Sequence, residues 1–327
     1  MSLENRIEAG GEVTPPRVLT AMITPFHENG SLNREGVQAI ANYLVENGSD
    51  GLVLVGTTGE SPVLNHQDHV EVFDLVRDAV GDKVPLIGGI GSNNTDEAVQ
   101  LTKAATTRGS VDGLLAVSPY YNRPPQYGIV DYYEQIRNAT DLPVTLYNIP
   151  VRTGEAVEIS TISDLFERGV INSLKDATGN TDMAADLHRV YEGNLVIYSG
   201  DDGKNLEFAR DAGAVGAISV HSHWAGKLTR QMFDAHFADD AKLADRIHEV
   251  LKPSSVFESR HTDGEGVYHD TPNPIPTKVM MSMILGADVV GKCLSPMVAD
   301  PREMAWLQNR AAEIFSDLQL FDGTDAV

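Results

Sequence analysis

"INSLKDATGN", residues 171–180, places a lysine directly after a short apolar run. Residues 170–174 form a short run of mostly β-branched and apolar residues, Val170, Ile171 and Leu174, which is typical of a buried strand. Lys175 and Asp176 follow, and a turn containing Gly179 comes next. The lysine has two interpretations. It sits at the strand tip and extends its ammonium into water, or it is a desolvated amine that serves as a nucleophile. The decapeptide alone favours the first interpretation, because lysines are rarely buried.

The same strand-then-helix order recurs along the chain. Strand-like runs lie at residues 18–23, 51–55, 84–90, 113–117, 144–147, 170–174, 195–198 and 214–220. Amphipathic stretches such as 33–46 and 95–107 lie between them, and Asn33 and either Asn94 or Thr95 are suited to cap those helices. Eight strands with eight crossovers predict an α/β fold, the (β/α)8 TIM barrel. A doubly wound sheet fits less well, since no GxGxxG follows the first strand.

The domain organisation follows from where the strands stop. We expect an N-terminal tail over residues 1–16, a catalytic barrel over 17–224 and a C-terminal helical region over 225–327. Helices are predicted near 225–237, 241–258, 275–285 and 301–318, and residues 259–276, rich in Gly, Pro and Asp, are predicted to form a loop. Such a helical appendage packs on the barrel or makes an oligomer contact, and the sequence does not decide between the two.

The composition limits the location and the partners. The chain has 327 residues, 42% of them hydrophobic, and a net charge of −22. Its one cysteine, Cys293, excludes an internal disulfide or a cysteine metal site and fits a reducing, cytoplasmic location. Residues 1–16 lack the apolar core of a signal peptide, and no apolar run approaches the length of a membrane span. The strong negative charge argues against nucleic acid and anionic membranes as partners.

Polar motifs follow several of the predicted strands. They are GTTGES at 56–61, SPYYNRP at 118–124, LYNIPVRTG at 146–154, Lys175, and SGDD at 199–202. In a TIM barrel, the active site forms where strands end and the βα-loops begin, so these groups should converge on the face that holds the lysine. A lysine among hydroxyls and phenols at a barrel mouth is a candidate Schiff-base former.

Taken singly, each of these residues has an ordinary explanation. Thr57 and Thr58 are suited to cap a turn, and the YY pair at 120–121 to pack as aromatics. Arg152 follows Pro150 in a loop, where it reads as a solvated surface charge. Tyr147 points inward or outward according to a strand register that the sequence leaves open by one residue.

Two other kinds of chemistry are disfavoured. No HExxH motif occurs, and His66 and His69 read as exposed residues at a helix start. His221 and His223 alternate at a strand end without a third ligand, so no metal site is expected. A Ser-His-Asp hydrolase would need a GxSxG elbow, which is absent from the sequence.

Together the five motifs resemble the dihydrodipicolinate synthase family, of the pyruvate-dependent class I aldolase (N-acetylneuraminate lyase-like) superfamily. The resemblance extends from Val18 to the NPIPTK segment at 273–278. It implies that Lys175 forms a Schiff base with pyruvate, without a metal or organic cofactor, and that Tyr147 moves protons. The relay partners it implies are Thr57 and Tyr121, with Tyr121 contributed by a neighbouring subunit. The implied substrate-binding positions are Thr58, Arg152, Gly200 and Ile218.

The resemblance also implies a substrate and a pathway. The second substrate would be L-aspartate 4-semialdehyde, and the product 4-hydroxy-tetrahydrodipicolinate, in lysine (diaminopimelate) biosynthesis. Arg152 favours this reaction, because a guanidinium binds a carboxylate with two hydrogen bonds and the relatives that act on sugar-derived 2-keto acids usually lack it. An aldolase of the 2-keto-3-deoxygluconate or N-acetylneuraminate type is the alternative. A catalytically dead relative is a second, although every catalytic position holds the expected residue type.

Regulation and assembly are implied in the same way. Many members of the family bind L-lysine in a cleft between two subunits of a homo-oligomer, a dimer of dimers. The matching positions are Ser61, His66, His69, Asn93, Glu97 and Tyr120, while Pro62 departs from the small residue often found beside them. Tyr120 adjoins the implied relay residue Tyr121, which would couple the two sites. We therefore expect L-lysine to act as an effector.

Overall fold

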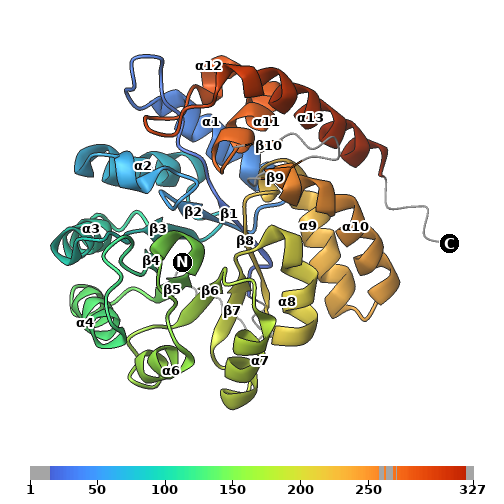
Figure 1. Cartoon of the computed structure of the whole chain (residues 1–327). Helices are drawn as coiled ribbons and strands as arrows, with labels where there is room; N and C mark the ends of the chain where they lie inside the picture. Colours follow the sequence, from blue (N-terminus) through green and yellow to red (C-terminus); the bar gives the residue numbers. More distant parts are fainter. Residues whose placement is uncertain (1–14, 258–260, 263–267, 270, 322–327) are drawn as a thin grey trace.

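The computed structural model describes residues 15–257, 261–262, 268–269 and 271–321. Eight parallel strands close into a barrel in which each strand pairs with the next and β8 pairs with β1. The strands are β1 Val18–Ala21, β2 Gly51–Leu54, β3 Leu86–Gly89, β4 Gly113–Val117, β5 Val144–Asn148, β6 Ser173–Asp176, β7 Val196–Ser199 and β8 Gly216–Ser219. The predicted TIM barrel is confirmed, and Figure 1 looks into it.

A ring of helices surrounds the barrel (Figure 1). Its members are α1 Arg34–Glu46, α2 His66–Val80, α3 Thr95–Arg108, α4 Gln126–Arg137, α6 Ile159–Glu167, α7 Thr181–Val190, α8 Asn205–Ala212 and α9 Ser222–Phe237. Three short helical segments lie in the loops, namely η2 Ser61–Val63, α5 Pro150–Thr153 and η3 Asp202–Lys204. The predicted caps form: the Asn33 side chain accepts from the Gly36 amide, and the Asn94 side chain accepts from the amides of Asp96 and Glu97. No described helix is long and apolar enough to cross a membrane.

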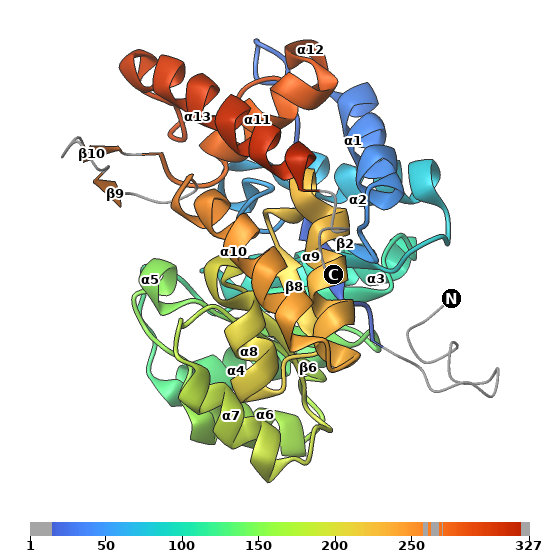
Figure 2. The same cartoon turned by 90° about the vertical axis from the view of Figure 1, so that its right-hand side faces the viewer.

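The C-terminal helices pack on this ring. They are α10 Ala241–Phe257, α11 Ile275–Leu285, α12 Ala287–Val290 and α13 Pro301–Leu320. Helix α10 contacts α9, α11 contacts α9 and α13, and α12 contacts α1. Figure 2 shows α11, α12 and α13 together at one end of the molecule, beside α1. The appendage therefore packs on the barrel, which the sequence left undecided.

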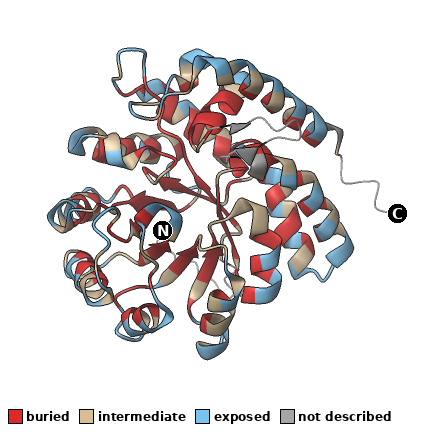
Figure 3. Cartoon of the chain, viewed as in Figure 1, coloured by how far each residue is buried: buried red, intermediate tan, exposed pale blue. Residues whose placement is uncertain are grey.

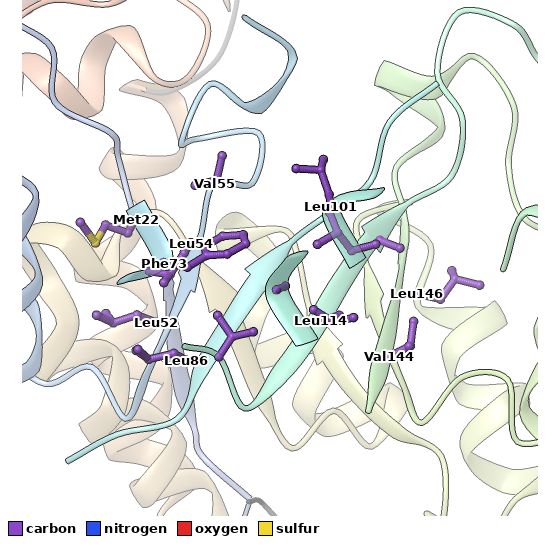
Figure 4. Close-up of a cluster of buried hydrophobic side chains, with 14 of the residues drawn as sticks. Met22, Leu52, Leu54, Val55, Phe73, Leu86, Leu101, Leu114, Val144 and Leu146 are labelled. Atoms are coloured by element: carbon purple, nitrogen blue, oxygen red, sulfur yellow. The ribbon is translucent and has the colours of Figure 1, made fainter. Parts of the chain in front are cut away.

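Alternating side chains divide the barrel wall into two faces. Leu146, Leu174 and Ile197 belong to the large core between strands and helices, whereas Tyr147 and Tyr198 belong to a separate cluster inside the barrel. Figure 3 shows buried residues concentrated in the strands and on the inward sides of the helices. Figure 4 shows part of the outer core, where strand residues such as Leu52 lie near Phe73. This alternation decides which side chains reach the site.

Two local predictions were wrong. Strand β6 spans Ser173–Asp176, not 170–174, because pairing with β5 begins only at Ser173. Val170 and Ile171 are apolar because they are buried in the helix–strand connection. The predicted loop at 259–276 contains a short antiparallel pair, β9 His261–Thr262 and β10 Tyr268–His269. The helix predicted at 275–285 is α11, with the predicted bounds.

The structure describes only part of the three predicted regions, the tail, the barrel and the C-terminal helices. Residues 1–14 of the predicted tail lie outside the described residues. The boundary between 224 and 225 stays a prediction, and it falls inside α9, the helix that follows β8 and packs against β1.

Candidate active site

Lys175 points into the barrel. In the strand register it pairs with Tyr147 on one side and Tyr198 on the other, and both tyrosines belong to the interior cluster. Lys175 is only 5% exposed. Its Nζ lies 4.2 Å from the centre of the Tyr147 ring. The first interpretation of the opening decapeptide is therefore wrong, because the Lys175 ammonium is buried and does not extend into water.

Burial has a direct effect on the basicity of this amine. It lowers the pKa of Lys175 from the usual 10.5 to about 8, since the charged form loses its hydration. Two charges contribute to this value: the negative charge of Asp202 opposes the shift, and the positive charge of Arg152 adds to it. A much larger fraction of this lysine than of an ordinary lysine is therefore the free amine near neutral pH, the form that can attack a carbonyl.

Tyr147 is the phenol beside this amine. Burial raises its pKa to about 12, and the charge of Arg152 and a hydrogen bond with the Thr57 side chain act in the opposite direction. Tyr147 is therefore protonated at neutral pH and can donate a proton. To release and regain this proton during turnover, Tyr147 needs a hydrogen-bonded partner, and the Thr57 side chain is in that position.

Tyr121, the other implied relay residue, is not buried in this chain. It follows β4 with a left-handed backbone (φ 70°), and its side chain is 88% exposed. The structure therefore does not bring Tyr121 to the barrel interior of its own chain. Arg152 is also exposed, in α5, but its charge acts on both Lys175 and Tyr147.

The GTTGES loop is a tight turn after β2. The Glu60 amide donates to the Thr57 carbonyl oxygen, and the Ser61 amide donates to the Gly56 carbonyl oxygen. Gly59 is required there, because a side chain would approach the Val55 Cα to 2.8 Å. This turn buries Thr58, which is 2% exposed.

Gly200 and Ile218, the two positions predicted to line the pocket, lie inside the barrel near Lys175 and Tyr147. A Cβ at Gly200 would lie 3.0 Å from the Lys175 Cε and 2.9 Å from the Ala177 Cβ, so the missing side chain leaves room beside the amine. Ile218 is 2% exposed and belongs to the same interior cluster as Tyr147.

Sequence reasoning missed two residues of this site. Tyr198 is the β7 neighbour of Lys175, and only the strand register identifies it. Asp202 is the acidic group that acts on the lysine; its Oδ2 accepts from the amides of Val220 and His221, at 2.7 and 3.1 Å. The SGDD motif marked Asp202 as polar and at a strand end, but nothing in the sequence joined it to Lys175.

The residues matched to a lysine site come from four neighbouring segments. Ser61 is in η2, His66 is exposed at the start of α2, Asn93 and Glu97 lie at the start of α3, and Tyr120 follows β4. The Asn122 amide donates to the Asn93 carbonyl oxygen at 2.9 Å, which joins the last two segments.

The expectation for His69 was wrong. It is buried, and its Nε2 lies 2.7 Å from the Gly89 carbonyl oxygen. Burial lowers its pKa to about 4, so the ring is neutral at physiological pH. The first turn of α2 faces the core at this position, which its polar sequence did not indicate.

The two later histidines were also misplaced. His221 precedes α9 and His223 lies in its first turn, not on a strand. His223 Nδ1 lies 2.7 Å from the Val220 carbonyl oxygen, and its Nε2 accepts from the Ile23 amide at 3.2 Å. His223 is therefore a buried structural residue. Among the residues that the structure describes, no three His, Cys, Asp or Glu side chains gather as a metal site.

Comparison with known proteins gives consistent results. A family model described as the dihydrodipicolinate synthetase family matches residues 14–312. The 4-hydroxy-tetrahydrodipicolinate synthase of Moorella thermoacetica is 40% identical over 287 residues, 88% of this chain and 94% of the relative. That of Parasynechococcus marenigrum is 42% identical over 268 residues, 82% of this chain and 85% of the relative.

Solved structures show the same similarity in three dimensions. Dihydrodipicolinate synthase from Bacillus anthracis has a TM-score of 0.83 and 34% identity, covering 91% of this chain and 97% of its own. The enzyme from Cyanidioschyzon merolae, solved with lysine bound, has a TM-score of 0.83 and 36% identity, covering 92% and 98%. By sequence and by fold, this chain belongs to the dihydrodipicolinate synthetase family.

Proposed function

We propose that Lys175 forms an imine with pyruvate, and that the resulting enamine condenses with L-aspartate 4-semialdehyde. The activity itself follows from family membership at about 40% identity over most of the chain: this is a 4-hydroxy-tetrahydrodipicolinate synthase of lysine biosynthesis. The observation that carries the proposed mechanism is the buried amine of Lys175, whose pKa is lowered to about 8 and which packs against the Tyr147 ring.

The chemistry can be followed atom by atom. The free amine of Lys175 adds to the keto carbon of pyruvate, and loss of water leaves a positively charged iminium. Loss of a proton from the methyl carbon gives the enamine, which adds to the aldehyde carbon while the aldehyde oxygen takes up a proton. The amino group of the semialdehyde then adds to the iminium carbon and expels Lys175, which closes the ring.

The neighbouring residues have distinct parts in this scheme. Tyr147 donates and accepts the protons, with Thr57 and Tyr121 as its relay. Thr58 donates to the carboxylate of pyruvate, and Gly200 and Ile218 leave room for the bound ketone. Arg152 binds the carboxylate of the semialdehyde. Because the iminium is the electron sink, the reaction requires no metal or organic cofactor.

Trapping with borohydride tests the proposal. Pyruvate and borohydride should convert the imine into a stable adduct on the one peptide that contains Lys175. Lys175→Ala should abolish the adduct and slow turnover by several orders of magnitude, because covalent catalysis is lost. Lys103→Ala, which removes an exposed lysine from α3, is the control and should trap pyruvate normally. An adduct on any other lysine would show that the assignment is wrong.

Assembly is the next part of the proposal. Tyr121, Tyr127 and Val151 follow β4 and β5 and are 85 to 88% exposed, which is unusual for large apolar side chains. We infer that a second copy of the chain covers them, and that the enzyme is a dimer of dimers in the cytoplasm. In this arrangement Tyr121 would enter the site of the partner subunit.

L-Lysine is proposed as an effector that binds near this surface. A relative from Cyanidioschyzon merolae has been solved with lysine bound. The exposed Glu97 carboxylate can pair with an α-ammonium group, and the Tyr120 hydroxyl can donate to a carboxylate. His69 can contribute only as a neutral ring, because burial lowers its pKa to about 4, and only through Nδ1, because its Nε2 lies 2.7 Å from the Gly89 carbonyl oxygen.

A dose–response assay tests the effector site. L-Lysine should partially inhibit the wild type, and Glu97→Ala should remove the inhibition with basal turnover retained. Asp96→Ala, a neighbouring exposed carboxylate, serves as the matched control and should leave inhibition intact. Unchanged rates over a wide lysine range, with no binding heat by calorimetry, would exclude the effector site and leave the synthase activity unaffected.

A further inference from the structure

The substrate-binding turn after β2 is attached to the C-terminal helical region at two points. Asn273, just before α11, donates from its Nδ2 to the Thr58 Oγ1 at 2.9 Å. Lys278, inside α11, forms an ion pair with Glu60, with the Lys278 Nζ 2.6 Å from the Glu60 Oε1. These residues are more than 200 positions apart in the sequence, so only the folded chain brings them together.

The hydrogen bond from Asn273 fixes the polarity of the Thr58 hydroxyl. The Thr277 hydroxyl donates to the Asn273 Oδ1 at 3.2 Å, so the Asn273 amide presents its N–H group, not its oxygen, to Thr58. A hydroxyl that accepts this bond keeps its own hydrogen for another acceptor. Thr58 is thereby prepared to donate to a carboxylate.

The ion pair holds the turn in place. The side chains of Lys278 and Glu60 are 4% and 1% exposed. Lys278 also donates to the Lys292 carbonyl oxygen at 2.6 Å, and the Glu60 Oε2 accepts from the Leu294 amide at 2.7 Å. Glu60 itself has a left-handed backbone (φ 61°), which a residue with a side chain adopts only where contacts hold it.

We propose that Asn273 is a positioning residue for pyruvate, because it orients the Thr58 hydroxyl to donate to the pyruvate carboxylate. The Glu60–Lys278 ion pair maintains the distance between Asn273 and Thr58. This inference rests on the proposed function, in which Thr58 binds that carboxylate. It assigns to the C-terminal region a part in substrate binding, in addition to its packing on the barrel.

The test measures pyruvate binding apart from the second substrate. The readout is the pyruvate concentration that gives half-maximal borohydride trapping on Lys175. Asn273→Ala should raise this half-maximal pyruvate concentration about 10-fold or more, the usual loss for a hydrogen bond that serves a charged group. The extent of trapping at saturating pyruvate should change little. Asn273→Asp, which has the same shape but an acceptor in place of the donor, should raise it further.

A double-mutant cycle separates positioning from a general structural role. In a Thr58→Val background, Asn273→Ala should have no additional effect, because the hydroxyl that it orients is gone. Asn42→Ala, which removes an asparagine hydrogen bond within α1, is the matched control and should bind pyruvate normally. Circular dichroism and melting curves confirm that each variant is folded, and Asn273→Asp answers the question if Asn273→Ala does not fold.

The outcomes distinguish this inference from the proposed function. If the wild type fails to trap pyruvate on Lys175, the proposed mechanism is wrong. If the wild type traps pyruvate but Asn273→Ala and Asn273→Asp match it, only the positioning role is excluded. Additive effects of Thr58→Val and Asn273→Ala would also overturn that role.

Discussion

At the residue scale, burial and two opposite charges set the basicity of one amine. The pKa of Lys175 is about 8 because burial lowers it, while the charge of Asp202 raises it and the charge of Arg152 lowers it. In the proposed mechanism Arg152 also binds the carboxylate of the semialdehyde. The bound carboxylate then partly neutralises the positive charge of Arg152 and weakens its effect on the pKa of Lys175. The amine therefore responds to the state of the whole site, not only to its own burial.

These charges predict how pyruvate trapping depends on pH. The rate at low pyruvate should rise with pH and level off above about 8, because only the free amine attacks. Arg152→Ala removes a positive charge that lowers the pKa, so the rising limb should move to higher pH. Asp202→Asn removes a negative charge that raises the pKa, so the limb should move to lower pH.

The Asp202→Asn variant is suited to this test. An asparagine oxygen can still accept from the Val220 and His221 amides, and the Asn205 side chain can present its oxygen to the new amide group. Initial trapping rates from pH 6 to 10, measured on all three proteins, check the signs. A shift of both variants in the same direction would contradict the electrostatic account.

At the element scale, the sequence predicted the existence and order of the strands better than their registers. Residues 113–117 were predicted with the observed bounds, because glycine and an apolar run mark that strand clearly. The β6 prediction was displaced, because Val170 and Ile171 are buried in a connection and resemble strand residues. That displacement placed Lys175 after the strand, whereas the pairing of β6 with β5 and β7 places it within the strand and facing inward.

The start of α9 offers a prediction about acid stability. His223 is buried and its pKa is lowered to about 4, from 6.5 in the unfolded chain. As pH falls from 6.5 towards 4 the unfolded chain takes up a proton that the folded chain does not, so stability is lost across that window. Because one pKa unit corresponds to about 1.4 kcal/mol, His223 should account for roughly 3 kcal/mol by pH 4.

A substitution isolates this contribution. His223→Asn should be less stable than the wild type at pH 8, because the hydrogen bond from the Ile23 amide is lost, but it should lose less stability between pH 6.5 and 4. His66→Asn, at an exposed position in α2, should follow the wild type. Urea unfolding at several pH values gives these differences, and an unchanged slope in His223→Asn would refute the assignment.

At the scale of the whole molecule, the net charge of −22 and the carboxylate groups of the substrates are in apparent conflict. An acidic surface repels the pyruvate anion at long range, and the semialdehyde, a zwitterion without net charge, is not attracted either, so binding of both carboxylates depends on local cations and oriented donors. In the proposed mechanism, Arg152, Lys175 and the Thr58 hydroxyl supply these at the carboxyl ends of the strands. Motifs at predicted strand ends marked all three residues as candidates. The attachment of Thr58 to Asn273 could not be predicted from the sequence, because it depends on how α11 packs against the barrel.

Assembly into oligomers, also a property of the whole molecule, determines whether the site is complete within one chain. Tyr121 is 88% exposed, so the relay proposed for Tyr147 needs a partner subunit to supply it. Lys175→Ala and Tyr121→Ala are each expected to be nearly inactive, the first without its nucleophile and the second without its relay. A mixed dimer, however, has one site with both an intact lysine and an intact tyrosine if Tyr121 acts across the interface.

Co-expression of these two variants with different affinity tags therefore gives a clear test. If subunits pair at random in a symmetric dimer, equal amounts should recover about a quarter of the wild-type activity, since half of the dimers are mixed and each has one working site. Either variant mixed with itself is the control and should recover nothing. If Tyr121 instead serves its own chain, every site in the mixture lacks one of the two groups and no activity returns. Purification on the two tags in succession retains only mixed species and confirms that both subunits are present.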